Sequence, residues 1–177
     1  VVDLAILFRD EKSAHSDEQH LATVDTFLVG AANDEITSAA TIAFSRLDRL
    51  PMVLPSRPSS WRHLLDEVSR RKGIAFHVVM EADSVTIQKE IAAKGGAYSI
   101  LGPYAMMEDV RVGRLQASRI VNPDIKRFVT LAMPKKGPLT LACKVIAQLI
   151  QQTAKELEGK GALRLGPGTT KARTGAR

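Results

Sequence analysis

Several kinds of residue are scarce in this chain of 177 amino acids, and each scarcity excludes a class of protein. Cys143 is the single cysteine, which excludes an internal disulfide framework and a cysteine-cluster metal site. Aromatic residues make up 5% of the chain, with Trp61 as the one tryptophan, which argues against a surface that stacks on nucleic-acid bases. No apolar run reaches the roughly 18 residues of a membrane helix. No basic-then-apolar leader is visible, so we expect a cytoplasmic protein without a membrane partner.

Positive charge is plentiful, but it is gathered at one end of the chain. The net charge is +6, and the last eighteen residues hold five uncompensated cations: Lys160, Arg164, Lys171, Arg173 and Arg177. Without these five, the remainder carries only about +1. Residues 159–177 combine glycine, threonine and basic residues without an apolar period, which is typical of a disordered tail. The charge therefore gives little support to a nucleic-acid-binding face.

Apolar segments with strand and helix periods alternate along the rest of the chain. Trp61, Leu64, Leu65 and Val68 follow the spacing of one helical face, and Gly73 is expected to end that helix. Further helices are expected to begin near residue 84 and at residue 138, whereas residues 9–20 and 31–50 are expected to form a polar loop and a mixed connector. Strands are expected at 1–8, 26–30, 51–55, 74–81, 97–101, 115–121 and 127–133. This alternation predicts an α/β protein with a parallel or mixed sheet.

No arrangement of residues typical of an enzyme is visible. The sequence has no Ser–His–Asp order, no phosphate-binding loop and no cysteine–histidine cluster. The acid pairs Asp66–Glu67 and Glu108–Asp109 are sequence neighbours, which do not face each other on a helix. His15 and His20 have no evident third metal ligand and fit no helical face. We therefore expect no catalytic residues, no metal and no cofactor.

An ordered series of segments carries a family resemblance over roughly residues 1–158. The most specific parts are LPSRP with the helix that follows it, and the glycine pair before AYSIL. The whole series is VDLAIL (2–7), TFLVG (26–30), PMVLPSRP (51–58), WRHLLDEVSRRKG (61–73), MEADS (80–84), AAKGGAYSIL (92–101), GRLQASRIVNPDIKR (113–127), RFVTLA (127–132) and PLTLACKVIAQLI (138–150). This series resembles the effector-binding domain of LysR-type bacterial transcription regulators.

The resemblance implies a two-lobed, periplasmic-binding-protein-like fold of type 2 with the first part of lobe one missing. Lobe one would hold residues 1–50 and 127–158, and lobe two would hold residues 51–126. A small-molecule effector would bind in the cleft between the lobes. DNA would be bound only through an N-terminal winged helix-turn-helix that this sequence does not include. The family also implies a homodimer or tetramer formed through the lobe edges.

Two predicted helix starts supply the residues that we expect to contact an effector. At the first, Ser56, Arg57 and Ser59 combine a hydroxyl-rich turn with a guanidinium, and the free amides and dipole of a helix start favour an anion. At the second, Asp83 and Ser84 form the turn that lines the cavity in the family. Here Asp83 would orient amides or accept from a donor on the ligand, because it would repel an anion.

Each of these residues also has a purely structural explanation. In this explanation the serines serve only as helix caps, and Arg57 lies on the surface. Tyr98 is a further candidate, because its hydroxyl would reach the cleft unless the ring is packed against the strand. Two other functions also fit a two-lobed fold. One is a solute-binding protein of a transporter, which upstream sequence would distinguish by a leader peptide. The other is an enzyme, which requires convergent acid, base or nucleophilic groups in the cleft.

Overall fold

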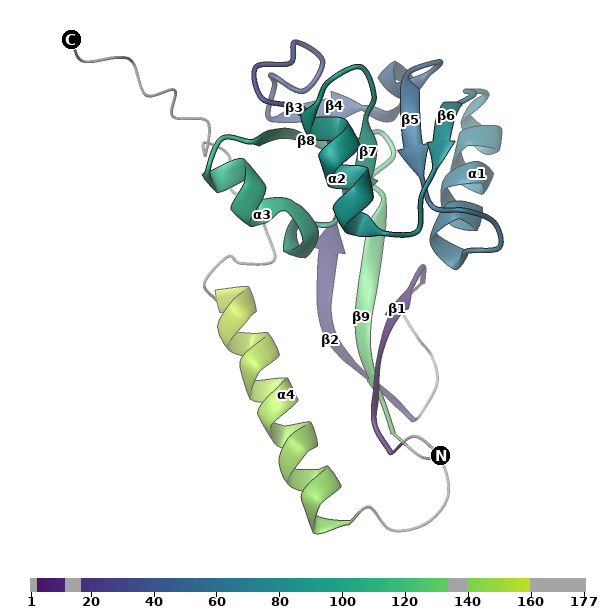
Figure 1. The fold of residues 1–177 in the computed structure, drawn as a ribbon. Coiled ribbons are helices and arrows are strands. Elements are labelled where there is room, and N and C mark those ends of the chain that lie inside the picture. Colours follow the sequence, from purple (N-terminus) through teal and green to yellow (C-terminus); the bar gives the residue numbers. More distant parts are fainter. Residues whose placement is uncertain (1–2, 12–16, 134–139, 160–177) are drawn as a thin grey trace, which may run out of the picture.

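The computed structural model of the chain describes residues 3–11, 17–133 and 140–159, which form a wide upper lobe and a narrow lower lobe (Figure 1). Strands and helices alternate as the sequence predicts. In chain order the elements are β1 (Ala5–Arg9), β2 (Glu18–Asp25), β3 (Phe27–Ala31), β4 (Thr41–Ala43), η1 (Phe44–Leu47), β5 (Pro51–Leu54), α1 (Ser60–Lys72), β6 (His77–Glu81), α2 (Val85–Ala93), β7 (Ser99–Leu101), α3 (Pro103–Arg111), β8 (Leu115–Val121), β9 (Lys126–Ala132) and α4 (Leu141–Gly159).

The upper lobe is built on two groups of strands that join into one sheet. Strands β4, β8, β3 and β7 are hydrogen-bonded in that order, and β5 pairs with β6 in parallel. The amide of Val53 donates to the carbonyl of Tyr98 at 2.7 Å, and the amide of Tyr98 donates to the carbonyl of Pro51 at 2.8 Å. The order across the lobe is therefore β6-β5-β7-β3-β8-β4, in which β5, β6 and the segment entering β7 run in the same direction.

Helices cover both faces of this sheet, because its central strand is apolar on both sides. Side chains alternate between the faces of a strand. Phe27 and Val29 of β3 accordingly belong to one core cluster with α2 and α3, whereas Leu28 belongs to the other with Leu65 of α1. All three β3 side chains are at most 3% exposed. The core is thus two apolar layers with the sheet between them.

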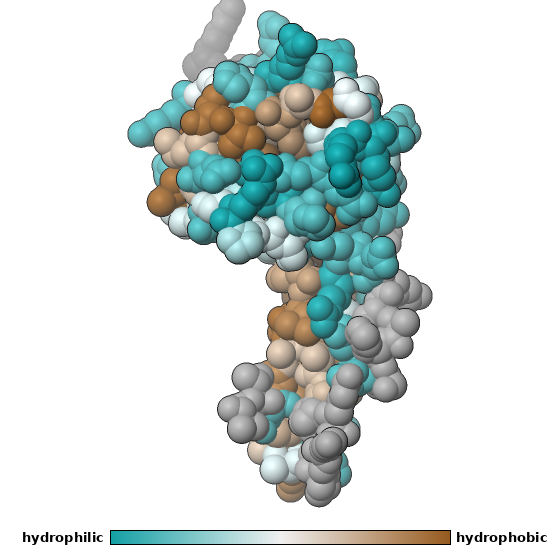
Figure 2. All heavy atoms as spheres, turned by 90° about the vertical axis from the view of Figure 1, so that its right-hand side faces the viewer, coloured by the Kyte–Doolittle hydropathy of each residue, from teal (hydrophilic) through white to brown (hydrophobic). Residues whose placement is uncertain are grey.

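The lower lobe is a three-stranded antiparallel sheet in the order β1-β9-β2, with α4 alongside β2. The side-chain nitrogen Nε2 of Gln151 in α4 donates to the side-chain oxygen Oε1 of Gln19 in β2 at 2.6 Å. Several apolar side chains of this lobe stay exposed, among them Ile6 and Phe8 of β1. Figure 2, in which the right-hand side of Figure 1 faces the viewer, shows apolar surface along the narrow lower part of the molecule. None of the helices in the described ranges is suited in length and hydropathy to cross a membrane.

Two stretches of chain connect the lobes and lie side by side. Residue Thr26 links β2 to β3, and residues 122–125 link β8 to β9. The hydroxyl of Thr26, a residue only 1% exposed, donates to the carbonyl of Ile125 at 2.9 Å. The amide of Ile120 donates to the carbonyl of Thr26 at 3.0 Å. The two connections are therefore tied together at the point where the chain passes between the lobes.

The strand pairing corrects the lobe boundary expected at residue 50. Strand β3 pairs with β7 and β8, and β4 pairs with β8, so residues 27–50 lie in the upper lobe. The prediction of a polar loop over residues 9–20 is also partly wrong, because β2 already begins at Glu18. Its polar side chain is used there, since the guanidinium of Arg9 on β1 donates to the Glu18 carboxylate across the lower sheet.

The helix predictions around α1 and α2 are confirmed. Ser59 and Ser84 are the N-caps, and they accept from the amides of Arg62 and Ile87, each at 3.4 Å. Gly73 ends α1 with a φ of 66°, in the left-handed region that glycine adopts without strain. The helix start expected at residue 138 and the tail expected from residue 160 onward lie outside the described residues.

Candidate ligand-binding site

A small pocket of about 100 Å³ lies where three neighbouring strands of the upper lobe end. Strands β5, β6 and β7 end at residues 54, 81 and 101, and the turns that follow lead into α1, α2 and α3. In open α/β sheets, ligands bind at this carboxyl edge. One lining residue, Arg127, comes from β9. The full lining is Pro55, Trp61, Asp83, Val85, Gln88, Ile100, Leu101, Gly102, Tyr104, Ala105 and Arg127.

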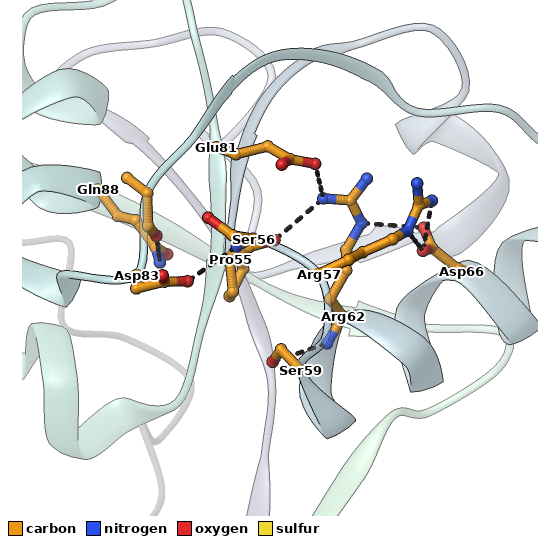
Figure 3. A network of polar contacts seen from close by, with 10 residues as sticks. Pro55, Ser56, Arg57, Ser59, Arg62, Asp66, Glu81, Asp83 and Gln88 are labelled. Carbon is orange, nitrogen blue, oxygen red and sulfur yellow. Dashed lines mark hydrogen bonds and ion pairs between the residues drawn. The ribbon is translucent and has the colours of Figure 1, made fainter.

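The turn after β5 is held in place by a buried arginine in α1 (Figure 3). The side chain of Arg62 is 4% exposed. Its Nη1 donates to the carbonyl of Pro55 at 3.0 Å and to Oε1 of Glu81 at 2.9 Å. Its Nε donates to Oδ1 of Asp66 at 3.0 Å. This one guanidinium therefore fixes the Pro55 turn to both α1 and the end of β6.

Arg57 is bound to the same carboxylate from the solvent side. Its Nε and Nη2 donate to Oδ2 of Asp66 at 2.9 and 2.6 Å, while its side chain is 65% exposed. Burial of Asp66 opposes ionisation, but the hydrogen bonds from Arg57 and Arg62 outweigh it and lower the pKa of the carboxyl. Arg57 and Ser59 line a second, open hollow beside α1, and neither of them is among the residues that line the pocket.

The turn after β6 orients the turn after β5. Oδ1 of Asp83 accepts from the amide of Ser56 at 2.9 Å (Figure 3), so this carboxylate orients an amide of the neighbouring turn. Gln88, 2% exposed, donates to the carbonyl of Ala82 at 2.7 Å and accepts from the hydroxyl of Ser99 at 2.7 Å. The buried amide thereby fastens the Asp83 turn to β7.

Tyr98 is not among the residues that line the pocket. Its hydroxyl donates to Oδ2 of Asp34 at 2.9 Å, and its ring lies 3.0 Å from the position that a Cβ on Gly30 would occupy. Burial and the Asp34 carboxylate raise the pKa of Tyr98 to about 12. Of the six residues expected to contact an effector, only Asp83 lines this pocket.

Replacing Tyr98 by phenylalanine is expected to cost about 1 kcal/mol of stability at neutral pH, because one hydrogen bond is lost. In the wild type the folded state keeps the phenolic proton between the ordinary pKa of 10.0 and about 12, so this group's contribution to stability falls as the pH rises through that window. Tyr98→Phe should lose both that decline and the late step in tyrosinate absorbance. Burial also raises the pKa of Tyr104, so Tyr104→Phe is the matched variant: it should keep the absorbance step near pH 12, and loss of that step in Tyr104→Phe instead would contradict the assignment.

Among the pocket residues that the sequence did not predict, three stand out by their chemistry: Trp61, Tyr104 and Arg127. The guanidinium carbon of Arg127 lies 4.8 Å from the Trp61 ring centroid and 4.7 Å from that of Phe8 on β1, which is within cation–π range. The Phe8 and Tyr104 ring centroids are 5.2 Å apart. The available signal was an arginine at the start of the otherwise apolar strand RFVTLA.

Contacts between the lobes converge on these side chains. Phe8 and Arg127 belong to the lower sheet, whereas Trp61 and Tyr104 begin α1 and α3 of the upper lobe. Gly102 permits this arrangement, because a Cβ at that position would lie 2.5 Å from the Tyr104 ring. The described residues contain no group of three or more histidine, cysteine, aspartate or glutamate side chains placed to hold a metal ion.

Comparison with known proteins identifies the family. The model of the LysR substrate binding domain matches residues 1–155. The HTH-type transcriptional regulator BbuR of Bordetella bronchiseptica is 32% identical over 113 residues, which are 64% of this chain and 34% of that protein. The chain thus spans about a third of the length of this relative.

Solved structures of related domains have the same architecture. The regulatory domain of CcmR from Synechocystis PCC6803 superposes with a TM-score of 0.74 and 17% identity, over 88% of this chain and 74% of that one. The effector-binding domain of QuiR gives 0.69 and 18% identity, over 87% and 72% of the two chains. These similarities confirm the expected α/β, periplasmic-binding-protein-like fold of type 2. Because the family model covers most of its length, the chain belongs to the LysR substrate binding domain family.

Proposed function

We propose that this chain is the ligand-sensing part of a LysR-type transcription regulator, and that its effector is a small organic anion. The observation that carries the proposal is the pocket, in which the amino ends of α2 and α3 meet Arg127. Helix amino ends and a guanidinium both favour a negatively charged ligand. The aromatic rings of Trp61 and Tyr104 supply apolar surface for the rest of the molecule.

The expected contact residues divide into two groups under this proposal. Asp83 lines the pocket, and Ser56 and Ser84 shape its turns through their backbone and cap hydrogen bonds. Arg57 and Ser59 serve the open hollow beside α1, and Tyr98 stabilises the Asp34 loop. The working site is therefore the Asp83 turn together with Trp61, Tyr104 and Arg127.

Relatives of known structure give this assignment a chemical parallel. The CcmR regulatory domain was solved with 2-PG, and the QuiR effector-binding domain with shikimate. Shikimate is a carboxylate, the kind of group that Arg127 would bind. The comparisons favour a regulator over a solute-binding protein of a transporter, because the family model and BbuR both point to LysR-type regulators.

Regulation would work by a shift between two arrangements of the lobes. A ligand that contacts both Arg127 of the lower sheet and the α2 turn of the upper lobe stabilises the closed arrangement relative to the open one. In the whole regulator, this change would pass to a DNA-binding winged helix-turn-helix through a homodimer or tetramer formed at the lobe edges. Under this proposal the chain itself carries no catalytic role and works in the cytoplasm.

The test uses the single tryptophan as a reporter, because Trp61 lines the pocket. The purified chain is titrated with small organic acids that include shikimate, benzoate, citrate and glutamate, and Trp61 emission and thermal unfolding are followed. At least one acid should give a saturable emission change and, at a hundredfold excess over its Kd, a stabilisation of about 2.7 kcal/mol. Ala105→Leu, which fills the pocket, should abolish both signals, while Arg57→Gln should keep them. Saturable binding that Ala105→Leu leaves intact would place the ligand elsewhere.

A further inference from the structure

The guanidinium of Arg127 is held by aromatic rings rather than by a carboxylate. Phe8 and Trp61 attract it by cation–π contacts, which use its charge but none of its N–H groups. Arg57, Arg62 and Arg114 each donate to a carboxylate instead. Arg127 is therefore a cation in the pocket lining whose position is fixed while a hydrogen-bonding edge is left available.

One donor on that edge has no acceptor. Nε of Arg127 is buried and makes no hydrogen bond within the described part of the chain. A buried donor without an acceptor is uncommon in folded proteins, because its lost hydration is not replaced. Since Arg127 also lines the pocket, a ligand oxygen is the natural acceptor. A carboxylate fits best, because its two oxygens match the paired N–H groups along one edge of a guanidinium.

Two groups compete for the Arg127 guanidinium. The Tyr104 hydroxyl is placed to accept a hydrogen bond from it, and the Asp10 carboxylate is attracted by its charge. Oδ1 of Asp10 is likewise buried without a hydrogen bond to any described residue, and Arg127 and His63 attract its carboxylate. Oδ1 of Asp10 and Nε of Arg127 therefore bond neither to each other nor to another described residue. Asp10 therefore adds negative charge near Arg127 without occupying its Nε, and an Asp10→Asn variant separates this electrostatic effect from ligand binding.

The charge of the pocket limits how many carboxylates it can accept. Arg127 is the one Lys, Arg or His among the described residues that line it, and Asp83 carries a negative charge on the opposite turn. A second carboxylate would lose its hydration without gaining a cation, which costs more than the pocket returns. The rings of Trp61 and Tyr104 favour a ligand in which the one carboxylate is attached to a flat, compact group.

We propose that Arg127 determines the ligand specificity of this pocket, by binding the single carboxylate of a flat monocarboxylic acid through Nε and the adjacent Nη. The inference rests on the proposed function of the pocket and names the class of ligand that it takes. The carboxylate completes the hydrogen bonding of Nε, and the ring or double bond of the acid packs against Trp61 and Tyr104. Neutral amides of the same shape bind more weakly, as do dicarboxylates.

The experiment measures Kd by calorimetry for three matched probes: benzoate, benzamide and phthalate. In the wild type, benzoate should bind at least about tenfold more tightly than either of the others, which is the scale of one charge-assisted hydrogen bond. Arg127→Gln should lose this tenfold preference while its weak benzamide binding stays unchanged. Arg127→Lys should recover only part of it, because an ammonium lacks the paired donors. Asp10→Asn and Arg57→Gln should keep the full preference, and thermal unfolding confirms that every variant is folded.

Several results would overturn the inference. They are equal benzoate affinity in Arg127→Gln and the wild type, tighter binding of phthalate than of benzoate, and failure of the wild type to bind benzoate. Each leaves the broader proposal intact if another organic acid binds in a manner that Ala105→Leu blocks. If no acid of the wider panel binds at all, the proposed function fails together with the inference.

Discussion

Replacing Arg62 by methionine is expected to lower the free energy of unfolding by about 3 kcal/mol, because it removes one partner of a buried charged network. Methionine keeps most of the side-chain length, so the loss reports on the charge and its hydrogen bonds. The carbonyl of Pro55 and two carboxylates would lose the hydrogen bonds from Arg62, although Asp66 would keep those from Arg57. Those carboxylates, on Asp66 and Glu81, are 30% and 45% exposed and regain some hydration, which keeps the expected cost at the lower end of the range.

Denaturant unfolding measures this effect, with Arg71→Met as the matched control. Arg71 lies on the same helix, but its side chain is 63% exposed and its ion pair with Glu67 is long, at 3.8 Å. Its loss should therefore cost less than about 0.5 kcal/mol. The two variants should also differ in acid. The lowered pKa of Asp66 gives stability that is present above the ordinary value of 3.8 and is lost as the pH falls through the folded-state value. Arg62→Met should weaken that loss, and equal stability of the two variants would contradict the role of the network.

Replacing Gln88 by alanine is expected to cost a similar amount, about 3 kcal/mol. The side chain is 2% exposed, so the substitution leaves a cavity and strands two buried polar groups, the Ser99 hydroxyl and the Ala82 carbonyl. The damage should reach the pocket as well, because Gln88 fastens the turn that carries Asp83. Thermal unfolding and the affinity for an organic acid should therefore decline together.

A second variant separates the hydrogen bonds from the packing. Gln88→Leu combined with Ser99→Ala fills most of the space and removes the partner hydroxyl, which leaves only the Ala82 carbonyl without its donor. Removal of both partners of a hydrogen bond costs less than removal of one. The double variant should therefore be more stable than Gln88→Ala. If it is equally unstable, the hydrogen bond to the Ala82 carbonyl, which both variants lack, holds this turn and packing contributes little.

The sequence predicted the fold well wherever a structural feature depends only on residues close together in the chain. The periodic apolar residues of α1, its Ser59 cap and its Gly73 terminus lie as expected, because each depends on neighbours within a few positions. The lobe boundary failed because β3 and β4 are assigned by pairing with strands some seventy to ninety residues away. An apolar pentapeptide such as TFLVG does not specify which sheet it joins.

The site was predicted less completely for the same reason. The helix start at Asp83 and Ser84 was predicted correctly because a helix start has a local signature. Arg57 and Tyr98 looked available in the sequence, but Asp66 and Asp34 bind them in the folded chain. Arg127 escaped notice because its importance comes from Phe8 and Trp61, which are distant in sequence and meet it only through the fold.

The hydrogen bond between Thr26 and Ile125 has a mechanical consequence. Because the two connecting stretches are tied together, one cannot bend without dragging the other, and the upper lobe is left with essentially a single easy rotation. Arg127 is two residues beyond this tie, so its side chain acts on a very short lever arm. Under the proposed function, a ligand held there would convert a small displacement at the guanidinium into a larger one at the far rim of the lobe.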